Sequence, residues 1–380
     1  MPKLTDIVGQ MTRFQRGVPN GAAVDRLVDL PHFGSNPGNL RARFYVPERV
    51  AARPALVVVL HGCTQNAAGY DRGAGWSRLA DRHGFVLLFP EQSPENNPNL
   101  CFNWFLPGDA RRDHGEALSI RQMIDRMAAD HRVDRARIFV TGLSAGGAMA
   151  SAMLASYPEV FAGGAIVAGL GYGFTSGVPQ AMARMRGQGL PDSADLDRAL
   201  RGASDHDGAW PTISVWHGSH DATVSPTNAD AIVAQWRSVH GISDAPDIRE
   251  TAVGHSRRAW RNTEGRVVIE QYVVAGMGHG TPLDTRASDG HEVAGAHMID
   301  AGISSTRRIA AFWGLTEKIA PADVDPDRAD ATAPEATLPA LRTIRLTPEP
   351  EPEPVSAGAG VPTGVGKVIE DALRAAGLMR

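Results

Sequence analysis

The ten residues from Ile138 to Gly147 constrain the fold more than any other part of the chain. An apolar, β-prone run leads into Gly-x-Ser-x-Gly, centred on Ser144, and the small residues that follow are typical of a helix. A serine on such a sharp strand-to-helix turn forms a nucleophile elbow. Gly142 and Gly146 let the strand and the helix approach without Cβ clashes. The pentapeptide also occurs in ordinary loops, so the prediction depends on its surroundings.

Apolar runs alternate with helical patterns along most of the chain. Ala55 to Leu60 is an unbroken apolar run, as expected for a central strand covered on both faces. Alternating strands and helices predict an α/β fold with a mostly parallel, doubly wound sheet. The segment from Phe174 to Trp210 lacks strand character and is predicted to be a helical insertion that acts as a lid. The other expected strands are 40–46, 85–89, 138–140, 164–168, 212–217 and 267–274, and the expected helices are 76–82, 116–131, 229–239 and 304–313.

The 380 residues are expected to form one catalytic domain with appendages. Residues 1–38 form an N-terminal extension, in which an apolar stripe from Leu4 to Phe14 fits a short amphipathic helix that docks on the protein's own core. The catalytic domain covers 39–315. A stiff linker rich in Pro, Ala and acidic residues follows over 316–364. The last segment, 365–380, is predicted to be an amphipathic helix that docks on a partner or on a surface.

Composition excludes several classes of partner. The net charge is −4, with 38 basic and 42 acidic residues intermixed, which argues against nucleic acid as a ligand. No run of eighteen apolar residues predicts a transmembrane helix. The N-terminus carries an acid and several polar residues where an export signal needs an apolar segment, so no signal peptide is expected.

Two further side chains are needed for a serine to attack a carbonyl: a base that takes its proton and an acid that orients the base. In doubly wound hydrolases the order is nucleophile, acid, histidine. Asp221 follows the predicted strand 212–217, at the edge where ligands bind. His279 follows the strand 267–274 and is flanked by glycines. Its rivals are His255, His291 and His297, and an Asp in a turn also caps helices.

The oxyanion of such a reaction needs two backbone N–H donors. One comes from Ala145, directly after the serine, and the other from the loop after an early strand, where Cys63 stands. Cys63 then contributes its amide, since a catalytic thiol has no matched base here. His61 is interpreted as a structural brace for that loop. The chemistry requires no cofactor and no metal ion.

Cys63 and Cys101 are the two cysteines of the chain and permit one disulfide. Closing a loop of this length stabilises a fold by about 4 kcal/mol in the chain-entropy model. Disulfides are typical of oxidising compartments, whereas the missing export signal indicates the cytoplasm. Both compartments therefore stay open at this point.

Several separate motifs occur in order along the chain. They are Leu60-His-Gly-Cys-Thr-Gln-Asn, Gly75-Trp-Ser-Arg-Leu-Ala-Asp, Phe89-Pro-Glu-Gln, Cys101-Phe-Asn-Trp-Phe, Gly115-Glu-Ala-Leu-Ser-Ile, Gly142-Leu-Ser-Ala-Gly-Gly and Trp216-His-Gly. With these motifs the chain resembles the poly(3-hydroxybutyrate) depolymerase-type esterases, relatives of feruloyl and acetylxylan esterases, over roughly residues 39–315. The resemblance implies an α/β-hydrolase fold, ester hydrolysis, a triad of Ser144, Asp221 and His279, a Cys63–Cys101 disulfide and secretion.

We therefore expect a serine carboxylesterase that works through an acyl-enzyme on poly- or oligo-(3-hydroxybutyrate) esters. The alternatives are a feruloyl or acetylxylan esterase and an acyltransferase of the same fold. Trp104 either lines the acyl pocket or packs in the core.

Overall fold

The computed structural model describes residues 25–288 and 290–316. The chain divides into two units, residues 1–306 and 307–380. The helices predicted around Leu4–Phe14 and over 365–380, and the linker over 316–364 except its first residue, lie outside the described residues. The domain boundaries therefore stay predictions.

A ten-stranded sheet forms the centre of the first unit, with the order β1-β2-β4-β3-β5-β6-β7-β10-β9-β8. The six central strands, β4, β3, β5, β6, β7 and β10, pair in parallel. The strands at the two edges, β1 and β2 on one side and β9 and β8 on the other, pair antiparallel. The predicted doubly wound, mostly parallel sheet is confirmed. The strands are β1 (Val28–Asp29), β2 (Arg41–Tyr45), β3 (Leu56–Leu60), β4 (Val86–Glu91), β5 (Ile138–Leu143), β6 (Gly163–Val167), β7 (Thr212–Gly218), β8 (Ile248–Ala252), β9 (His255–Arg261) and β10 (Val267–Val274).

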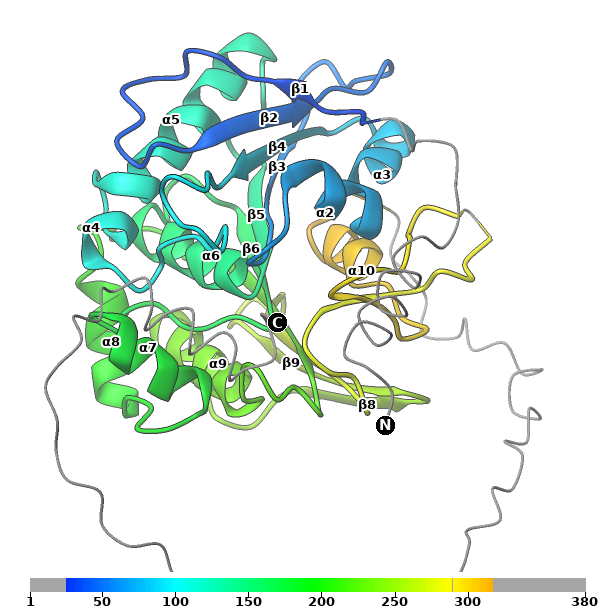
Figure 1. Ribbon diagram of the computed structural model, residues 1–380. Helices are drawn as coiled ribbons and strands as arrows, with labels where there is room; N and C mark the ends of the chain where they lie inside the picture. Colours follow the sequence, from blue (N-terminus) through cyan, green and yellow to red (C-terminus); the bar gives the residue numbers. More distant parts are fainter. Residues whose placement is uncertain (1–24, 289, 317–380) are drawn as a thin grey trace, which may run out of the picture. The chain divides into compact units, whose positions relative to one another are not determined.

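Helices cover both faces of the sheet (Figure 1). In Figure 1, α5, α6 and α9 lie on one side of the strands, and α2 and α3 lie on the other. The helices are α2 (Ala67–Ala74), α3 (Trp76–His83), α4 (Pro107–Ala110), α5 (Gly115–Asp130), α6 (Ala145–Ser156), α7 (Val178–Met185), α8 (Ser193–Arg201), α9 (Thr227–His240) and α10 (Ser305–Phe312). Two short strands before α10, β11 (Thr281–Leu283) and β12 (Met298–Asp300), form a separate parallel pair. In the described residues, no helix is long and apolar enough to cross a membrane.

The core is built from the apolar strands and the inner faces of the helices. All five residues of β3 and all six of β5 are buried, as the unbroken apolar runs predict. The insertion contains α7 and α8, and Leu200 of α8 belongs to the same buried cluster as Trp236 of α9. The insertion is therefore helical, as predicted, and its role as a lid stays a prediction.

Candidate active site

Ser144 occupies the turn between β5 and α6, where the sequence places it. Its backbone angles are φ 56° and ψ −117°, a region that residues with side chains rarely adopt. The turn is held by a hydrogen bond from the Ser144 N–H to the carbonyl of Val167, with an N to O distance of 2.9 Å. This strained turn presents the serine at the carboxyl edge of the sheet, beside the end of β6.

Gly146 brings the elbow against the end of β3. A Cβ at this position would lie 2.4 Å from the carbonyl oxygens of both Leu60 and His61, closer than real Cβ atoms come to backbone. Only glycine therefore allows the start of α6 to contact the loop that follows β3.

Asp221 and His279 meet at the ends of neighbouring strands. β7 and β10 pair in parallel, so the loops that follow them leave the same edge of the sheet. Gly218 lets the two loops touch, since a Cβ there would lie 2.2 Å from the Met277 carbonyl oxygen. His279 Nδ1 lies 2.8 Å from Asp221 Oδ2. A carboxylate only accepts, so Nδ1 donates and Nε2 is the accepting nitrogen of the neutral ring.

The structure thus brings together two of the three predicted side chains. Ser144 lies at the end of β5, which β6 separates from β7 in the sheet. In the part of the chain that the structure describes, no hydrogen bond joins the Ser144 hydroxyl to His279. His297, one of the predicted rivals, lies beside His279, with ring centroids 5.8 Å apart and its Nδ1 3.2 Å from the His279 carbonyl oxygen.

The Asp221 carboxylate is almost fully enclosed and accepts four hydrogen bonds. The backbone N–H groups of Thr223 and Val224 donate to Oδ1 at 2.9 and 2.8 Å. His279 and His217 reach Oδ2, the latter with its Nε2 at 3.2 Å. Burial alone would raise the pKa of Asp221, but the hydrogen bonds from His217 and His279 outweigh it and hold the pKa below its usual range. The group is therefore ionised at neutral pH.

Sequence reasoning did not identify His217 as part of this site. The residue stands four positions before Asp221, in the Trp216-His-Gly motif on β7. Its place near the end of β7, four residues before the predicted acid, was the available signal.

The loop after β3 carries the predicted oxyanion donor. Within the described residues, neither the backbone N–H of Cys63 nor that of Ala145 donates a hydrogen bond. His61 braces this loop, because its Nε2 accepts from the Gln92 N–H at 3.1 Å and its Nδ1 lies 2.8 Å from the Gly62 carbonyl oxygen. Burial lowers the pKa of His61, and the ring is neutral with its proton on Nδ1.

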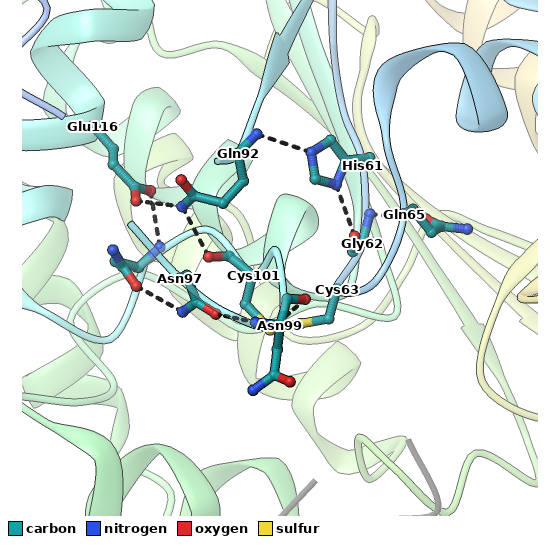
Figure 2. Close-up of a disulfide and its surroundings, with 10 residues drawn as sticks. His61, Gly62, Cys63, Gln65, Gln92, Asn97, Asn99, Cys101 and Glu116 are labelled. Carbon is teal, nitrogen blue, oxygen red and sulfur yellow. Dashed lines mark hydrogen bonds between the residues drawn. A yellow bond between two sulfur atoms is a disulfide. The ribbon is translucent and has the colours of Figure 1, made fainter. Parts of the chain in front are cut away.

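Cys63 and Cys101 form a disulfide, so the predicted pairing is confirmed. Figure 2 shows the bridge between the loop after β3 and the Asn-rich loop before α4. A second link runs beside it, from the Thr64 N–H to the Asn99 carbonyl at 2.7 Å. The two loops are therefore held together by both a covalent and a hydrogen bond.

Glu116, at the start of α5, is the centre of a polar network beside the disulfide (Figure 2). It is fully buried and accepts from the Gln92 side chain at 2.6 Å and from the Asn103 N–H at 2.8 Å. Gln92 also donates to the Cys101 carbonyl at 2.9 Å. Burial raises the pKa of Glu116 to about 8, although these donors oppose the shift. The sequence analysis did not identify this network.

Trp104 lines a cavity of about 260 Å³ beside α6. Its ring also packs edge-to-face on Phe105, with 5.7 Å between the ring centroids. Trp104 therefore both packs against a neighbouring aromatic side chain and lines the cavity. Arg111 is the one charged residue of the cavity lining. The remaining lining residues are Pro107, Ala110, Ala148, Ala152, Gly171, Tyr172, Gly173, Phe174, Thr175 and Ala199. Within the described residues, no group of three or more His, Cys, Asp or Glu side chains is arranged to hold a metal ion.

The mostly parallel sheet with helices on both faces is an α/β-hydrolase fold. Among solved structures, an acetyl xylan esterase from Aspergillus awamori matches with a TM-score of 0.65 at 23% identity, covering 76% of this chain and 99% of that one. The family model described as Esterase PHB depolymerase matches residues 40–260. The chain belongs to this esterase family and is a carboxylic ester hydrolase.

Two relatives illustrate the range of the family. The chain is 43% identical over 298 residues to poly(3-hydroxyalkanoate) depolymerase C from Paucimonas lemoignei, covering 78% of this chain and 72% of that protein. It is 30% identical over 292 residues to acetylxylan esterase A from Aspergillus oryzae, covering 73% of this chain and 92% of that protein.

Proposed function

We propose that the chain hydrolyses esters through an acyl-enzyme in which Ser144 is the nucleophile, His279 the base and Asp221 the acid. The observation that carries the proposal is the 2.8 Å contact between His279 Nδ1 and Asp221 Oδ2, because it leaves Nε2 free to accept a proton. Hydrogen bonds between nucleophile and base often tighten only when substrate binds, so this role is compatible with the absence, among the described residues, of a hydrogen bond between the Ser144 hydroxyl and His279.

In the proposed reaction His279 Nε2 takes the Ser144 proton while Oγ attacks the carbonyl carbon. The resulting oxyanion accepts hydrogen bonds from the N–H groups of Cys63 and Ala145, which lack other acceptors in the described chain. The imidazolium then protonates the leaving alcohol. Water, deprotonated by His279, releases the acid and regenerates Ser144.

The substitution Ser144→Ala tests this assignment. It is expected to abolish p-nitrophenyl ester turnover with an unchanged melting temperature. Ser151→Ala is the matched control, since Ser151 lies on α6, the helix that follows Ser144, and is also buried. Activity retained by Ser144→Ala would refute the proposal.

For the substrate we propose poly- or oligo-(3-hydroxybutyrate). The relative named as a poly(3-hydroxyalkanoate) depolymerase supports it, as does the mainly apolar cavity that contains Trp104. Arg111 has no acidic partner among the described residues and suits the free carboxylate that ends every hydroxyacid oligomer. Rates on hydroxybutyrate oligomers, acetylated xylan and methyl ferulate would discriminate the candidates.

Acetylxylan is the second candidate substrate, because the acetylxylan esterase relative matches over most of its own length. Faster hydrolysis of acetylated xylan than of hydroxybutyrate oligomers would favour it. An acyltransferase is distinguished by product analysis with a competing alcohol.

The disulfide supports a proposed location outside the cell, where such bonds persist. Immunodetection in medium and lysate of the producing organism tests this.

We further propose that residues after Leu315 dock on a partner or on insoluble substrate. Their deletion is expected to reduce that binding and leave soluble-ester turnover intact.

A further inference from the structure

His217 is a buried histidine that contacts the proposed catalytic acid, Asp221, and takes no part in the reaction proposed above. It is the sixth residue of β7 and is 1% exposed. Its Nε2 lies 2.8 Å from the Val224 carbonyl oxygen and 3.2 Å from Asp221 Oδ2. The same Oδ2 receives Nδ1 of His279 at 2.8 Å. One carboxylate oxygen is therefore shared by two imidazole rings.

The protonation of His217 follows from its contacts. A backbone carbonyl only accepts, so the proton of the neutral ring resides on Nε2, which donates to both Val224 and Asp221. Nδ1 is buried without a hydrogen-bond partner in the described part of the chain. A second proton there would create a buried charge and an unsatisfied donor, both of which are costly. His217 therefore acts as a hydrogen-bond donor through Nε2 and cannot replace His279 as a base through that nitrogen.

We propose that His217 is a positioning residue that holds the Asp221 carboxylate ionised and oriented toward His279. The inference rests on the triad under "Proposed function". His217 and the turn at 223–224 fix both carboxylate oxygens, so Oδ2 meets His279 without reorganisation. Its hydrogen bond also stabilises the charged form of the acid.

The other titratable groups around the acid are few. His279 and its neighbour His297 approach from the loops after β10 and before β12. His220 precedes Asp221 but is exposed, and its Nδ1 lies 2.9 Å from the Ser219 hydroxyl. Among these groups His217 is the one whose loss removes a donor from Asp221 while leaving the His279 contact in place.

The test compares His217→Leu, which removes the donor, with His217→Gln, which keeps an N–H near the position of Nε2. The acidic limb of the kcat/KM profile on p-nitrophenyl butyrate reports protonation of the base. In His217→Leu the charge of Asp221 Oδ2 is no longer shared with a second donor and favours the imidazolium of the base more strongly, so this limb moves up by about 0.5 to 1 in pH. Its kcat falls about tenfold with little change in KM. His217→Gln restores much of both values.

His240→Leu is the matched control, because His240 also meets a backbone carbonyl, that of Pro211 at 3.0 Å. It is expected to lower the melting temperature without moving the acidic limb. A His217→Leu enzyme that folds and keeps the wild-type acidic limb would overturn the inference.

A second measurement serves if His217→Leu does not fold. Nitrogen-15 NMR of histidine-labelled wild-type enzyme is expected to show the His217 proton on Nε2, the nitrogen that faces the Val224 carbonyl oxygen. A ring whose proton lies on Nδ1 alone would contradict the inference. Ser144→Ala separates the two levels: its retained activity refutes the triad, whereas an inactive Ser144→Ala with an unchanged His217→Leu profile refutes only His217.

Discussion

Reduction of the Cys63–Cys101 disulfide is expected to lower the free energy of unfolding by about 4 kcal/mol. The bridge closes a loop of 38 residues, for which the chain-entropy relation gives about 13 cal/mol/K, or about 4 kcal/mol at 25 °C. With a urea dependence of ~3 kcal/mol/M, the unfolding midpoint falls by about 1.3 M. Urea titration followed by tryptophan fluorescence, with and without dithiothreitol, measures this difference.

The same reduction is expected to affect catalysis separately from stability. The bridge restrains Cys63, whose N–H is a proposed oxyanion donor, while the Thr64–Asn99 hydrogen bond keeps the loop near its place. An oxyanion donor acts in the transition state, so kcat falls and KM stays nearly constant. We expect roughly a tenfold loss, less than the removal of a donor costs, at a temperature where both forms are folded.

The double variant Cys63→Ser/Cys101→Ser is the control for reagent effects. It is expected to match the reduced wild type in both measurements and to be insensitive to dithiothreitol. Equal unfolding midpoints for the oxidised and reduced wild-type enzyme would refute the entropic argument. A loss of stability with an unchanged kcat would refute the positioning of the Cys63 amide by the bridge.

Three further substitutions test other parts of the site. Gly146→Ala places a Cβ 2.4 Å from two carbonyl oxygens and is expected to lower kcat on p-nitrophenyl butyrate roughly 100-fold, whereas Gly108→Ala, with no atom within 4 Å of the added Cβ, leaves it unchanged. Arg111→Gln is expected to lower kcat/KM about tenfold on a free-acid hydroxybutyrate trimer and not on the methyl ester of that trimer. Arg112→Gln, which loses an ion pair to Glu159, is the control. An equal loss on both substrates would contradict a role of Arg111 in binding the carboxylate. Because burial raises the pKa of Glu116 from 4.5 to about 8, the folded state binds more protons than the unfolded state between these pH values, and the free energy of unfolding falls as pH rises through them. Glu116→Gln is expected to remove this decline, which is on the order of 5 kcal/mol, and so to flatten the plot of unfolding free energy against pH. An unaltered slope in the variant would refute this expectation.

The central strands were predictable because they are buried on both faces and their sequences are apolar throughout. The hairpin of β8 and β9 was missed, since it lies at the sheet edge and carries Arg257, which pairs with acids on the strands to either side of β9. Arg257 on β9, for example, pairs with Glu270 on β10 at 3.0 Å. Such a strand is stabilised by cross-strand partners rather than by an apolar pattern, so periodicity does not reveal it.

In the candidate site, too, some contacts were predictable and others were not. The contact between Asp221 and His279 was predictable because each residue follows a strand of a parallel sheet, and strand ends converge at one edge. Glu116 was not, because its partners Gln92 and Asn103 come from a loop without regular structure. Hydrogen-bond partners of this kind depend on the path of a loop, which composition does not specify.

The positions of the proposed reactive groups depend on backbone contact as much as on the side chains themselves. At Gly146 the turn that carries Ser144 contacts the end of β3 and the loop after it, and at Gly218 the loops after β7 and β10 contact each other. A side chain at either position would separate two segments by more than the tolerance of a proton transfer. His217 and Glu116 then act on the segments so joined, the first through Asp221 and the second through Gln92 and the disulfide loop. Substitutions at these supporting positions should therefore reduce kcat before they alter substrate binding.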